Sequence, residues 1–238
     1  MFIICTSVKA FPTLSAARED AILSEATIGE QAQDGSRAHI LAVAAQCFRE
    51  RGYAATSIDD VARRLGATKG RIYHHFSSKG DLFAQVFRAG MDMNFEAIAP
   101  FENMGGRAID VWRAAACAHV RSMIVTQAFQ RVVWEGVELH MRGSTTPEER
   151  SKYNELIEYR ARYDRIFRSL IVRARDDGDM KFDNASIAAQ IMFTSMNSPI
   201  FWYSPRSDQS GDDIGQIVKQ VVDFVQGGLG GKVERVDD

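Results

Sequence analysis

The stretch that most limits what this chain can fold into is residues 58–87, where two short helical patterns are joined by a glycine turn. Ser57 precedes the first pattern and Asp60 follows three residues later, the arrangement of a capping box. Gly66 ends that pattern, because glycine takes the left-handed conformation at little cost. Apolar residues recur in it at helical spacing: Ile58, Val61, Ala62 and Leu65. The stretch therefore predicts two helices joined by a tight turn.

The second pattern, residues 69–76, is poor in aliphatic residues and rich in polar ones. Ile72 and Phe76 anchor it, and its open face offers cations, imidazoles and a phenol, which suit phosphates and base edges in a major groove. Gly70 lets the backbone approach DNA closely, and a helix N-terminus favours an anion. The alternative is a solvated surface helix with two incidental histidines. We expect DNA to be read by Lys69, Gly70, Arg71, Tyr73 and His74, and the backbone to be positioned by Thr56, Ser57, Thr68, His75 and Lys79.

Residues 40–87 resemble the DNA-binding domain of the TetR family of bacterial transcriptional repressors. The resemblance implies a homodimer that binds a palindromic operator in double-stranded DNA and is released when a small molecule fills its C-terminal domain. It is carried by Ala44, Phe48, Gly52, Tyr53, Thr56, Ser57, Ile58, Ala62, Gly66, Lys69, Gly70, Tyr73, His75, Phe76, Lys79, Leu82 and Phe83.

Composition and charge agree with this reading. With 238 residues, 45% of them hydrophobic and 25% charged, the chain is typical of a soluble protein of one or two domains. Its formal net charge of −2 argues against a general polyanion binder. Positive charge is nevertheless concentrated in residues 34–89, which carry nine Lys or Arg against five Asp or Glu. Electrostatic steering towards DNA needs that distribution.

The three cysteines are widely spaced and form no metal or redox signature, so we expect no metal and no cofactor. Cys47 lies on the apolar side of a predicted helix and is expected to be a buried, reduced thiol. No apolar run approaches the length that crosses a bilayer, and the first residues lack a secretory pattern. The sequence thus predicts a cytoplasmic protein without a membrane partner.

The predicted fold is all-α, with three parts. Residues 1–35 are expected to be a flexible N-terminal extension, residues 36–90 a three-helix DNA-binding head, and residues 91–238 a ligand-binding and dimerisation domain. Helices are predicted over residues 36–51, 58–65, 69–76, 78–97, 108–129, 130–141, 147–176, 185–196 and 213–227.

Two apolar helices near the C-terminus suit a dimer interface in which two copies form a four-helix bundle. Their stripes equally suit the core of a single protomer, and the sequence leaves both open. The stripes consist of Ile187, Ile191 and Thr194 on one helix, and Ile217, Val221, Phe224 and Val225 on the other.

A ligand-gated switch needs a pocket among the middle helices, and the aromatic and methionine residues there favour a flat or hydrophobic ligand. Such residues at helical spacing also fill ordinary cores, so this second reading stays open. The candidates are Trp112, Phe129, Trp134, Met141, Tyr159, Tyr163, Phe167, Met192, Phe193 and Met196, with Arg160 and Asn197 as polar groups.

The segment Trp202-Tyr203-x-Pro205 is similar to the end of TetR-family members that control lipid, sterol or aromatic-acid breakdown. Many of these respond to acyl-CoA thioesters, which implies an acyl-CoA or another hydrophobic effector. The usual glycine-rich continuation is replaced here by residues 206–208, Arg-Ser-Asp, which leaves the ligand class open. With a CoA thioester, Arg160 or Arg162 would meet its phosphates.

Two other functions were weighed. One is a DNA-binding protein of the same fold without an effector pocket. The other is an enzyme, which the sequence disfavours because His140, near Glu135 and Glu138, has no accompanying nucleophile or metal-ligand spacing. No catalytic residue is predicted.

Overall fold

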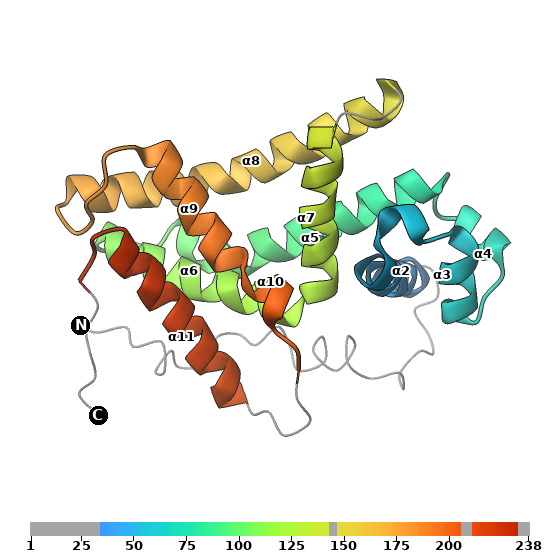
Figure 1. The fold of residues 1–238 in the computed structure, drawn as a ribbon, viewed down its shortest axis with the longest axis horizontal. Coiled ribbons are helices and arrows are strands. Elements are labelled where there is room, and N and C mark those ends of the chain that lie inside the picture. Colours follow the sequence, from blue (N-terminus) through green and yellow to red (C-terminus); the bar gives the residue numbers. More distant parts are fainter. Residues whose placement is uncertain (1–33, 143–146, 206–210, 233–238) are drawn as a thin grey trace. The chain divides into compact units, whose positions relative to one another are not determined.

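The computed structural model describes residues 34–142, 147–205 and 211–232, and the extension expected over residues 1–35 lies almost entirely outside them. Every element in the described part is a helix, as predicted (Figure 1). The described residues form two compact units: a head unit, residues 34–91, 128–142 and 147–157, and a C-terminal unit, residues 92–127, 158–205 and 211–232. The division falls inside two long helices, α5 (Lys79–Glu102) and α8 (Pro147–Asp176).

The head unit begins with α2 (Asp34–Ala55), which breaks at Gly52. Gly52 has φ 76° and ψ 166°, a conformation that glycine adopts without strain. The chain therefore turns back at Tyr53, whose ring lies 4.8 Å from that of Phe83, while Phe48 lies 5.2 Å from the same ring, centroid to centroid. Phe48 and Phe83 are buried and Tyr53 is half-buried, and the three rings join α2 to α5 in the head core.

Helix α3 (Ile58–Leu65) has the predicted capping box. The Asp60 N–H donates to the Ser57 hydroxyl over 3.1 Å, and the Ser57 N–H donates to the Asp60 carboxylate over 3.0 Å. Gly66 ends the helix at φ 65° and ψ 30°, the left-handed region. The capping residues at its two ends therefore predicted the bounds of this helix correctly.

Helix α4 (Lys69–Tyr73) is shorter than the predicted range of 69–76. The N–H groups of His75 and Phe76 both donate to the Ile72 carbonyl, at 3.0 Å each. Two donors on one carbonyl tighten the chain into a turn after Tyr73. Thr68 stands at the N-cap, where a threonine hydroxyl can cap the first turn, but it makes no side-chain capping hydrogen bond.

Helix α7 (Gln127–Arg142) packs closely on α5 within the head unit. A Cβ added at Gly136 would lie 2.6 Å from Phe87 Cδ2, and one added at Gly90 would lie 2.8 Å from Val133 Cγ2. Both distances are too short for any side chain, so these two glycines set the spacing of the helices. Gln130 adds a hydrogen bond of 3.1 Å from its Nε2 to the Gly90 carbonyl.

The C-terminal unit is built on α6 (Ala108–Val125), which contacts α9 (Ala185–Asn197), α10 (Pro199–Trp202) and α11 (Gly211–Gly228). Asn184 caps α9 as predicted, its side-chain oxygen accepting from the N–H groups of Ser186 and Ile187. Helix α6 ends at Val125, earlier than the predicted residue 129, and the Thr126 hydroxyl donates to the Ser122 carbonyl over 2.6 Å. A threonine that takes a helix carbonyl in this way favours an end to the helix.

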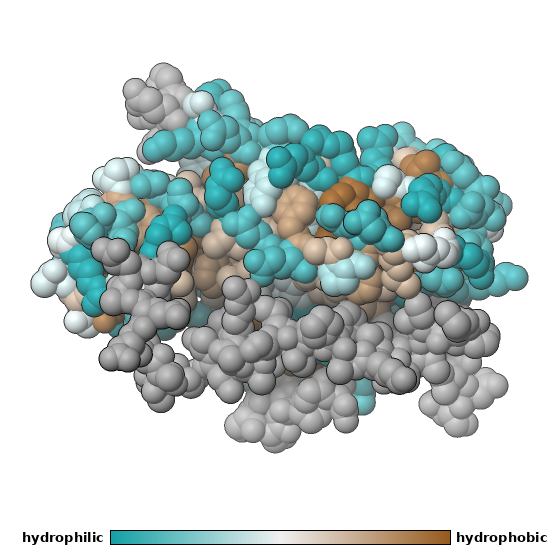
Figure 2. Space-filling model, turned by 180° about the vertical axis from the view of Figure 1, so that it is seen from behind, coloured by the Kyte–Doolittle hydropathy of each residue, from teal (hydrophilic) through white to brown (hydrophobic). Residues whose placement is uncertain are grey.

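Hydrophilic residues cover most of the described surface visible in Figure 2, and apolar residues gather in patches between them. In the described ranges, no helix is both long enough and apolar enough to pass through a bilayer.

Candidate functional sites

Helix α4 presents its polar side chains outward. Ile72 is fully buried and Phe76 is 1% exposed, so these two residues fix the segment to the head core. The side chain of Tyr73 is 47% exposed, although it is large and partly apolar. The residues predicted to read DNA are all exposed: Lys69, Gly70, Arg71, Tyr73 and His74. His75 is half-buried.

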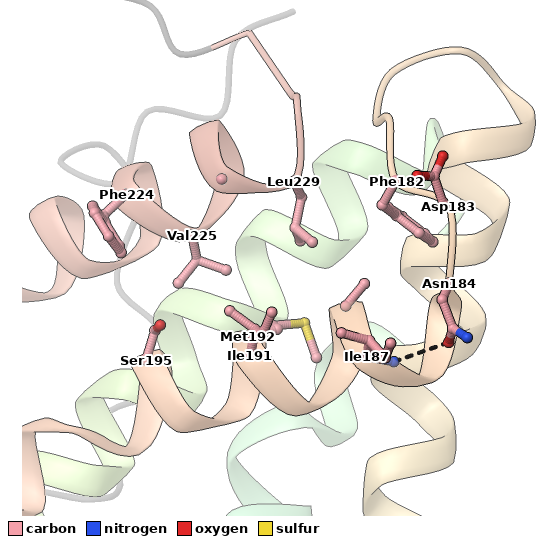
Figure 3. Close-up of a pocket in the computed structure, with 12 residues that line it drawn as sticks. Phe182, Asp183, Asn184, Ile187, Ile191, Met192, Ser195, Phe224, Val225 and Leu229 are labelled. Atoms are coloured by element: carbon pink, nitrogen blue, oxygen red, sulfur yellow. Dashed lines mark hydrogen bonds between the residues drawn. The ribbon is translucent and has the colours of Figure 1, made fainter.

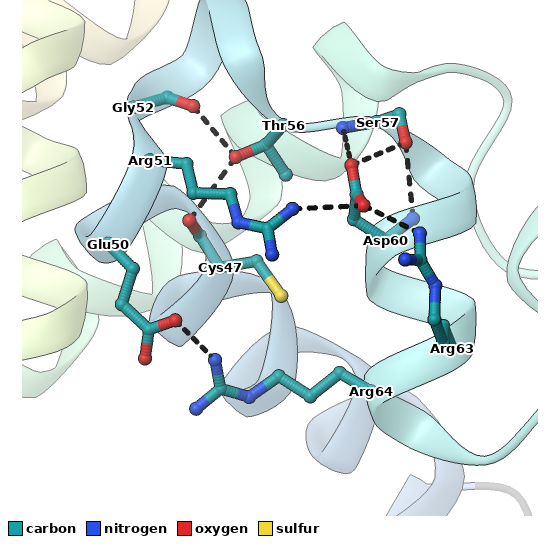
Figure 4. Close-up of polar contacts among 9 residues, drawn as sticks. All are labelled: Cys47, Glu50, Arg51, Gly52, Thr56, Ser57, Asp60, Arg63 and Arg64. Carbon is teal, nitrogen blue, oxygen red and sulfur yellow. Dashed lines mark hydrogen bonds and ion pairs between the residues drawn. The ribbon is translucent and has the colours of Figure 1, made fainter.

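Acidic residues of the head pair with its arginines (Figure 4). One carboxylate oxygen of Asp60 binds Arg51 at 3.0 Å and Arg63 at 2.7 Å, and Glu50 binds Arg64 at 2.6 Å. Hydrogen bonds from the Ser57 hydroxyl and backbone, together with the two arginines, lower the pKa of Asp60 to about 2. The capping carboxylate therefore stays ionised at any physiological pH.

Lys69 makes an ion pair that the sequence reading did not anticipate. Its Nζ lies 3.0 Å from Asp59 Oδ2, and both side chains are at least half exposed. The hydrogen bond to Asp59 raises the pKa of Lys69. Asp59 was missed because the sequence signals considered in α3 were the Ser57–Asp60 capping box and the apolar spacing. A carboxylate on the helix before a basic reading helix is the signal that would have found it.

Three predicted backbone-positioning residues are engaged inside the head itself. Thr56 is 1% exposed, and its hydroxyl donates to the Gly52 carbonyl over 2.7 Å. Lys79 donates from Nζ to the Tyr53 carbonyl over 2.9 Å, and Ser57 is the N-cap of α3. These contacts order the turn that leads into α3, while contact of the same residues with DNA stays a prediction.

The C-terminal unit holds a buried polar group within aromatic rings. His119 is 2% exposed, and its Nε2 lies 2.9 Å from Asn197 Oδ1 while its Nδ1 lies 2.8 Å from the Tyr163 hydroxyl. Because the Asn197 oxygen only accepts, the ring carries its proton on Nε2 and accepts the Tyr163 hydroxyl proton on Nδ1. Burial lowers the pKa of His119 to about 4, so the ring is neutral near pH 7.

Most of the predicted ligand residues lie around this histidine or beside it in the same unit. The rings of Phe167 and Phe193 lie 5.7 Å and 5.8 Å from His119, centroid to centroid. Trp112 is fully buried and donates from Nε1 to the Met192 sulfur over 3.3 Å. The predicted residues found in this unit are Trp112, Tyr159, Arg160, Tyr163, Phe167, Met192, Phe193, Met196 and Asn197.

Other polar side chains of the C-terminal unit are also paired. Arg160 binds Asp164 at 3.1 Å, and the Tyr159 hydroxyl donates to Asp92 over 2.5 Å. Burial raises the pKa of Asp164. Arg162 is exposed, and its guanidinium carbon lies 4.8 Å from the centroid of the Tyr159 ring. Asp92, Phe95 and His119 were not among the predicted residues, although Phe95 continues the helical spacing of α5 from Met91.

Three predicted ligand residues belong to the head unit: Phe129, Trp134 and Met141. Phe129 is buried against α5, where its Cβ and carbonyl approach Gly90. Met141 is 72% exposed near the end of α7. These residues lie in a different unit from the group around His119, and their contact with a ligand stays a prediction.

Helices α9 and α11 leave an open apolar groove of about 310 Å³ between them (Figure 3). In the close-up, Ile187, Ile191 and Met192 of α9 face Val225 of α11 across it, with Leu229 just beyond that helix. The exposed fractions of Ile187, Ile191 and Phe224 are 59%, 62% and 74%. Each of the two apolar stripes therefore has residues that face outward. Val225, in contrast, packs inward.

Models of two protein families match this chain. The model described as bacterial regulatory proteins of the tetR family matches residues 40–86, and a tetracyclin repressor-like C-terminal domain matches residues 105–229. The chain belongs to the TetR family. The first match ends inside α5, and the second begins just before α6 and reaches the end of α11.

Relatives of this TetR-family protein are transcriptional regulators. It is 31% identical over 112 residues to the HTH-type transcriptional regulator AcrR of Shigella flexneri, covering 44% of this chain and 49% of AcrR. It is 24% identical over 205 residues to the HTH-type transcriptional repressor KstR2 of Rhodococcus jostii, covering 83% of this chain and 92% of KstR2.

Among solved structures, the crystal structure of AibR in complex with isovaleryl coenzyme A and operator DNA has the same fold. The two chains superpose with a TM-score of 0.63 at 21% identity, covering 82% of this chain and 97% of AibR.

Proposed function

We propose that this TetR-family protein is a repressor that binds a palindromic operator as a homodimer and is released by a hydrophobic small molecule. The observation that carries the proposal is the outward face of α4, where Lys69, Tyr73 and His74 are exposed while Ile72 is fully buried. A helix held by two apolar anchors and bare elsewhere suits insertion into a major groove.

The apolar groove between α9 and α11 supports the homodimer. Exposed Ile187, Ile191 and Phe224 lie beside it, and a two-fold axis would cover the same residues of both copies at once. Two heads then meet half-sites about one helical turn apart, or a multiple of it, which a single head lacks the contacts to hold tightly.

The aromatic core of the C-terminal unit supports a hydrophobic effector. Tyr163, Phe167 and Phe193 surround the His119–Asn197 pair, so an apolar ligand with one polar group would find both kinds of partner there. AibR, which has this fold, has been crystallised with an acyl-CoA and operator DNA. For an acyl-CoA effector, exposed Arg162 is better suited to the phosphates than Arg160, which is paired with Asp164.

A second candidate is a regulator of the same fold that has no effector pocket. It is favoured by the packing of the same aromatic rings on one another, with 5.4 Å between the centroids of Phe167 and both Tyr163 and Phe193. Titration with acyl-CoA thioesters and free fatty acids, followed by operator release, separates the two candidates. In neither case do we propose a catalytic activity or a cofactor.

The DNA-reading assignment is tested by replacing Lys69 or Tyr73 with Ala. A duplex selected by the wild-type protein from a randomised pool serves as the probe, and fluorescence anisotropy gives the dissociation constant. Each substitution is expected to weaken binding about tenfold, because each removes a contact of a helix inserted in the groove. Lys152→Ala, an exposed lysine on α8, is the matched control and should bind as the wild type does. Unchanged affinity in both Lys69→Ala and Tyr73→Ala would remove α4 as the reading helix.

Asp59→Asn is expected to strengthen binding to operator and non-operator DNA alike. In the free head, Asp59 pairs with Lys69, so a DNA phosphate must replace this carboxylate and then tolerate its charge nearby. An exposed pair of this kind is weak, so the expected gain in affinity is modest, about threefold. The slope of log affinity against log salt should steepen by about one counterion. Glu155→Gln on α8 removes the same charge elsewhere and should change neither quantity. Weaker binding by Asp59→Asn would contradict the competition.

A further inference from the structure

Two charged side chains bind the backbone of Tyr53, where the chain turns from α2 towards α3. Its N–H donates to Glu135 Oε1 over 2.7 Å, and its carbonyl accepts from Lys79 Nζ over 2.9 Å. Lys79 Nζ also lies 4.4 Å from the centroid of the Tyr53 ring. The N–H and the carbonyl of Tyr53 belong to the two peptide groups on either side of its Cα, and a charged partner holds each of them more strongly than a neutral one would.

Tyr53 lies at the start of the segment that orients α3. Gly52, just before it, has the positive φ that only glycine adopts freely, and its carbonyl accepts from the Thr56 hydroxyl over 2.7 Å. Ser57, the N-cap of α3, follows Thr56 directly. Tyr53 is only five positions before Ile58, the first residue of α3. A change in its backbone orientation would therefore reorient the N-terminus of α3 and, with it, α4.

Glu135 belongs by sequence to the matched C-terminal domain, residues 105–229, yet it contacts the DNA-binding head. Its helix, α7, is held against α5 by the close contacts at Gly90 and Gly136. The carboxylate therefore has little freedom to follow α3 and α4 if these two helices move. In the chain, α7 follows α6 after Thr126 alone. A shift of α7 would therefore be passed to the turn at Tyr53 through the Glu135 hydrogen bond.

We propose that Glu135 is a positioning residue for operator binding: its hydrogen bond to the Tyr53 peptide ties the orientation of α3 and α4 to helix α7. This inference rests on the proposed function, and it adds a connection to the head that is separate from the covalent path along α5. The hydrogen bond requires an acceptor at this place and not a negative charge.

The test compares Glu135→Leu, which has no acceptor, with Glu135→Gln, which keeps one. Operator affinity is measured on the duplex selected by the wild-type protein, amide exchange of Tyr53 by NMR or mass spectrometry, and melting temperature by calorimetry. Glu135→Leu should bind about tenfold more weakly and exchange the Tyr53 amide about tenfold faster, the loss expected for one hydrogen bond to a charged group. Glu135→Gln should stay within about twofold of the wild type in both measurements, because an amide oxygen also accepts.

Glu138→Leu is the matched control, because Glu138 lies on the same helix and reaches Arg142 only at 3.9 Å. It should leave operator affinity and Tyr53 exchange unchanged. Wild-type affinity in Glu135→Leu would overturn the inference, as would a loss that Glu135→Gln shares or a loss matched by a lower folded fraction at the assay temperature. If the wild-type protein itself selects no duplex, the proposed function fails first, and the result is distinguishable from failure of the positioning role.

Discussion

Replacing Phe224 with Asp is expected to convert the proposed homodimer into a monomer. The Phe224 side chain is 74% exposed on α11, beside the groove that Ile187, Ile191 and Val225 line. Burying a phenylalanine at an interface is worth about 2 kcal/mol, and a two-fold dimer buries two, so their loss costs about 4 kcal/mol. That cost corresponds to a rise of about a thousandfold in the dimer dissociation constant.

Sedimentation equilibrium measures the effect directly, and operator anisotropy measures its consequence. A monomer presents one head to a palindrome, so operator affinity should fall by at least about a hundredfold. Met141→Asp is the matched control, because Met141 is 72% exposed on α7 in the other unit. It should leave the assembly unchanged. A Phe224→Asp protein that remains a dimer at micromolar concentration would show that the α9–α11 groove is not the interface.

The head was predictable from sequence because its signals are local. The Ser57 capping box, the Gly66 turn and the spacing of apolar residues each act within one or two helical turns, and the structure confirms all three. The end of α4 was predicted three residues too late. Phe76 is buried as expected, but it is reached through a turn in which two amides share the Ile72 carbonyl. Helical spacing does not distinguish that turn from another helical residue.

Contacts between distant segments could not be read in the same way. Glu135 and Tyr53 are 82 residues apart, and nothing in the periodicity of α7 marks Glu135 as different from Glu138. The same holds for α9, where Ile191 and Met192 are adjacent apolar residues, one 62% exposed and the other 1% exposed. An apolar stripe shows that a surface is covered, and only the fold shows whether its own protomer covers it.

The ligand candidates are more scattered along the sequence than the DNA candidates. The DNA residues fall within 24 consecutive positions, residues 56–79, whereas the ligand candidates extend from Trp112 to Asn197. Hydrophobic and aromatic composition selected them without regard to neighbours, so residues of both units were included. His119 was not among the candidates, and in the structure it is a buried core residue with two hydrogen-bond partners.

Because His119 is buried, we expect its protonation to lower the stability of the protein in acid. Its pKa falls from the ordinary value of 6.5 to about 4 in the folded state, because burial disfavours the imidazolium. The folded protein therefore binds fewer protons than the unfolded chain between these two values. Stability is fully present above pH 6.5 and is lost as the pH falls towards 4. The shift corresponds to a loss of about 3 kcal/mol in the free energy of unfolding.

The variant His119→Gln isolates this contribution, since glutamine keeps polar atoms near Tyr163 and Asn197 but does not titrate in this range. Urea unfolding followed by tryptophan fluorescence at pH 7, 5.5 and 4.5 gives the free energy of unfolding for both proteins. The variant starts lower at pH 7, because its hydrogen bonds are less well placed, and its further loss on acidification should be smaller than that of the wild type by about 3 kcal/mol. His140→Gln, a half-exposed histidine on α7, serves as the control and should follow the wild-type curve. Parallel curves for His119→Gln and the wild type would mean that His119 becomes protonated without unfolding, and the neutral Nε2–H tautomer assigned to it would then be wrong.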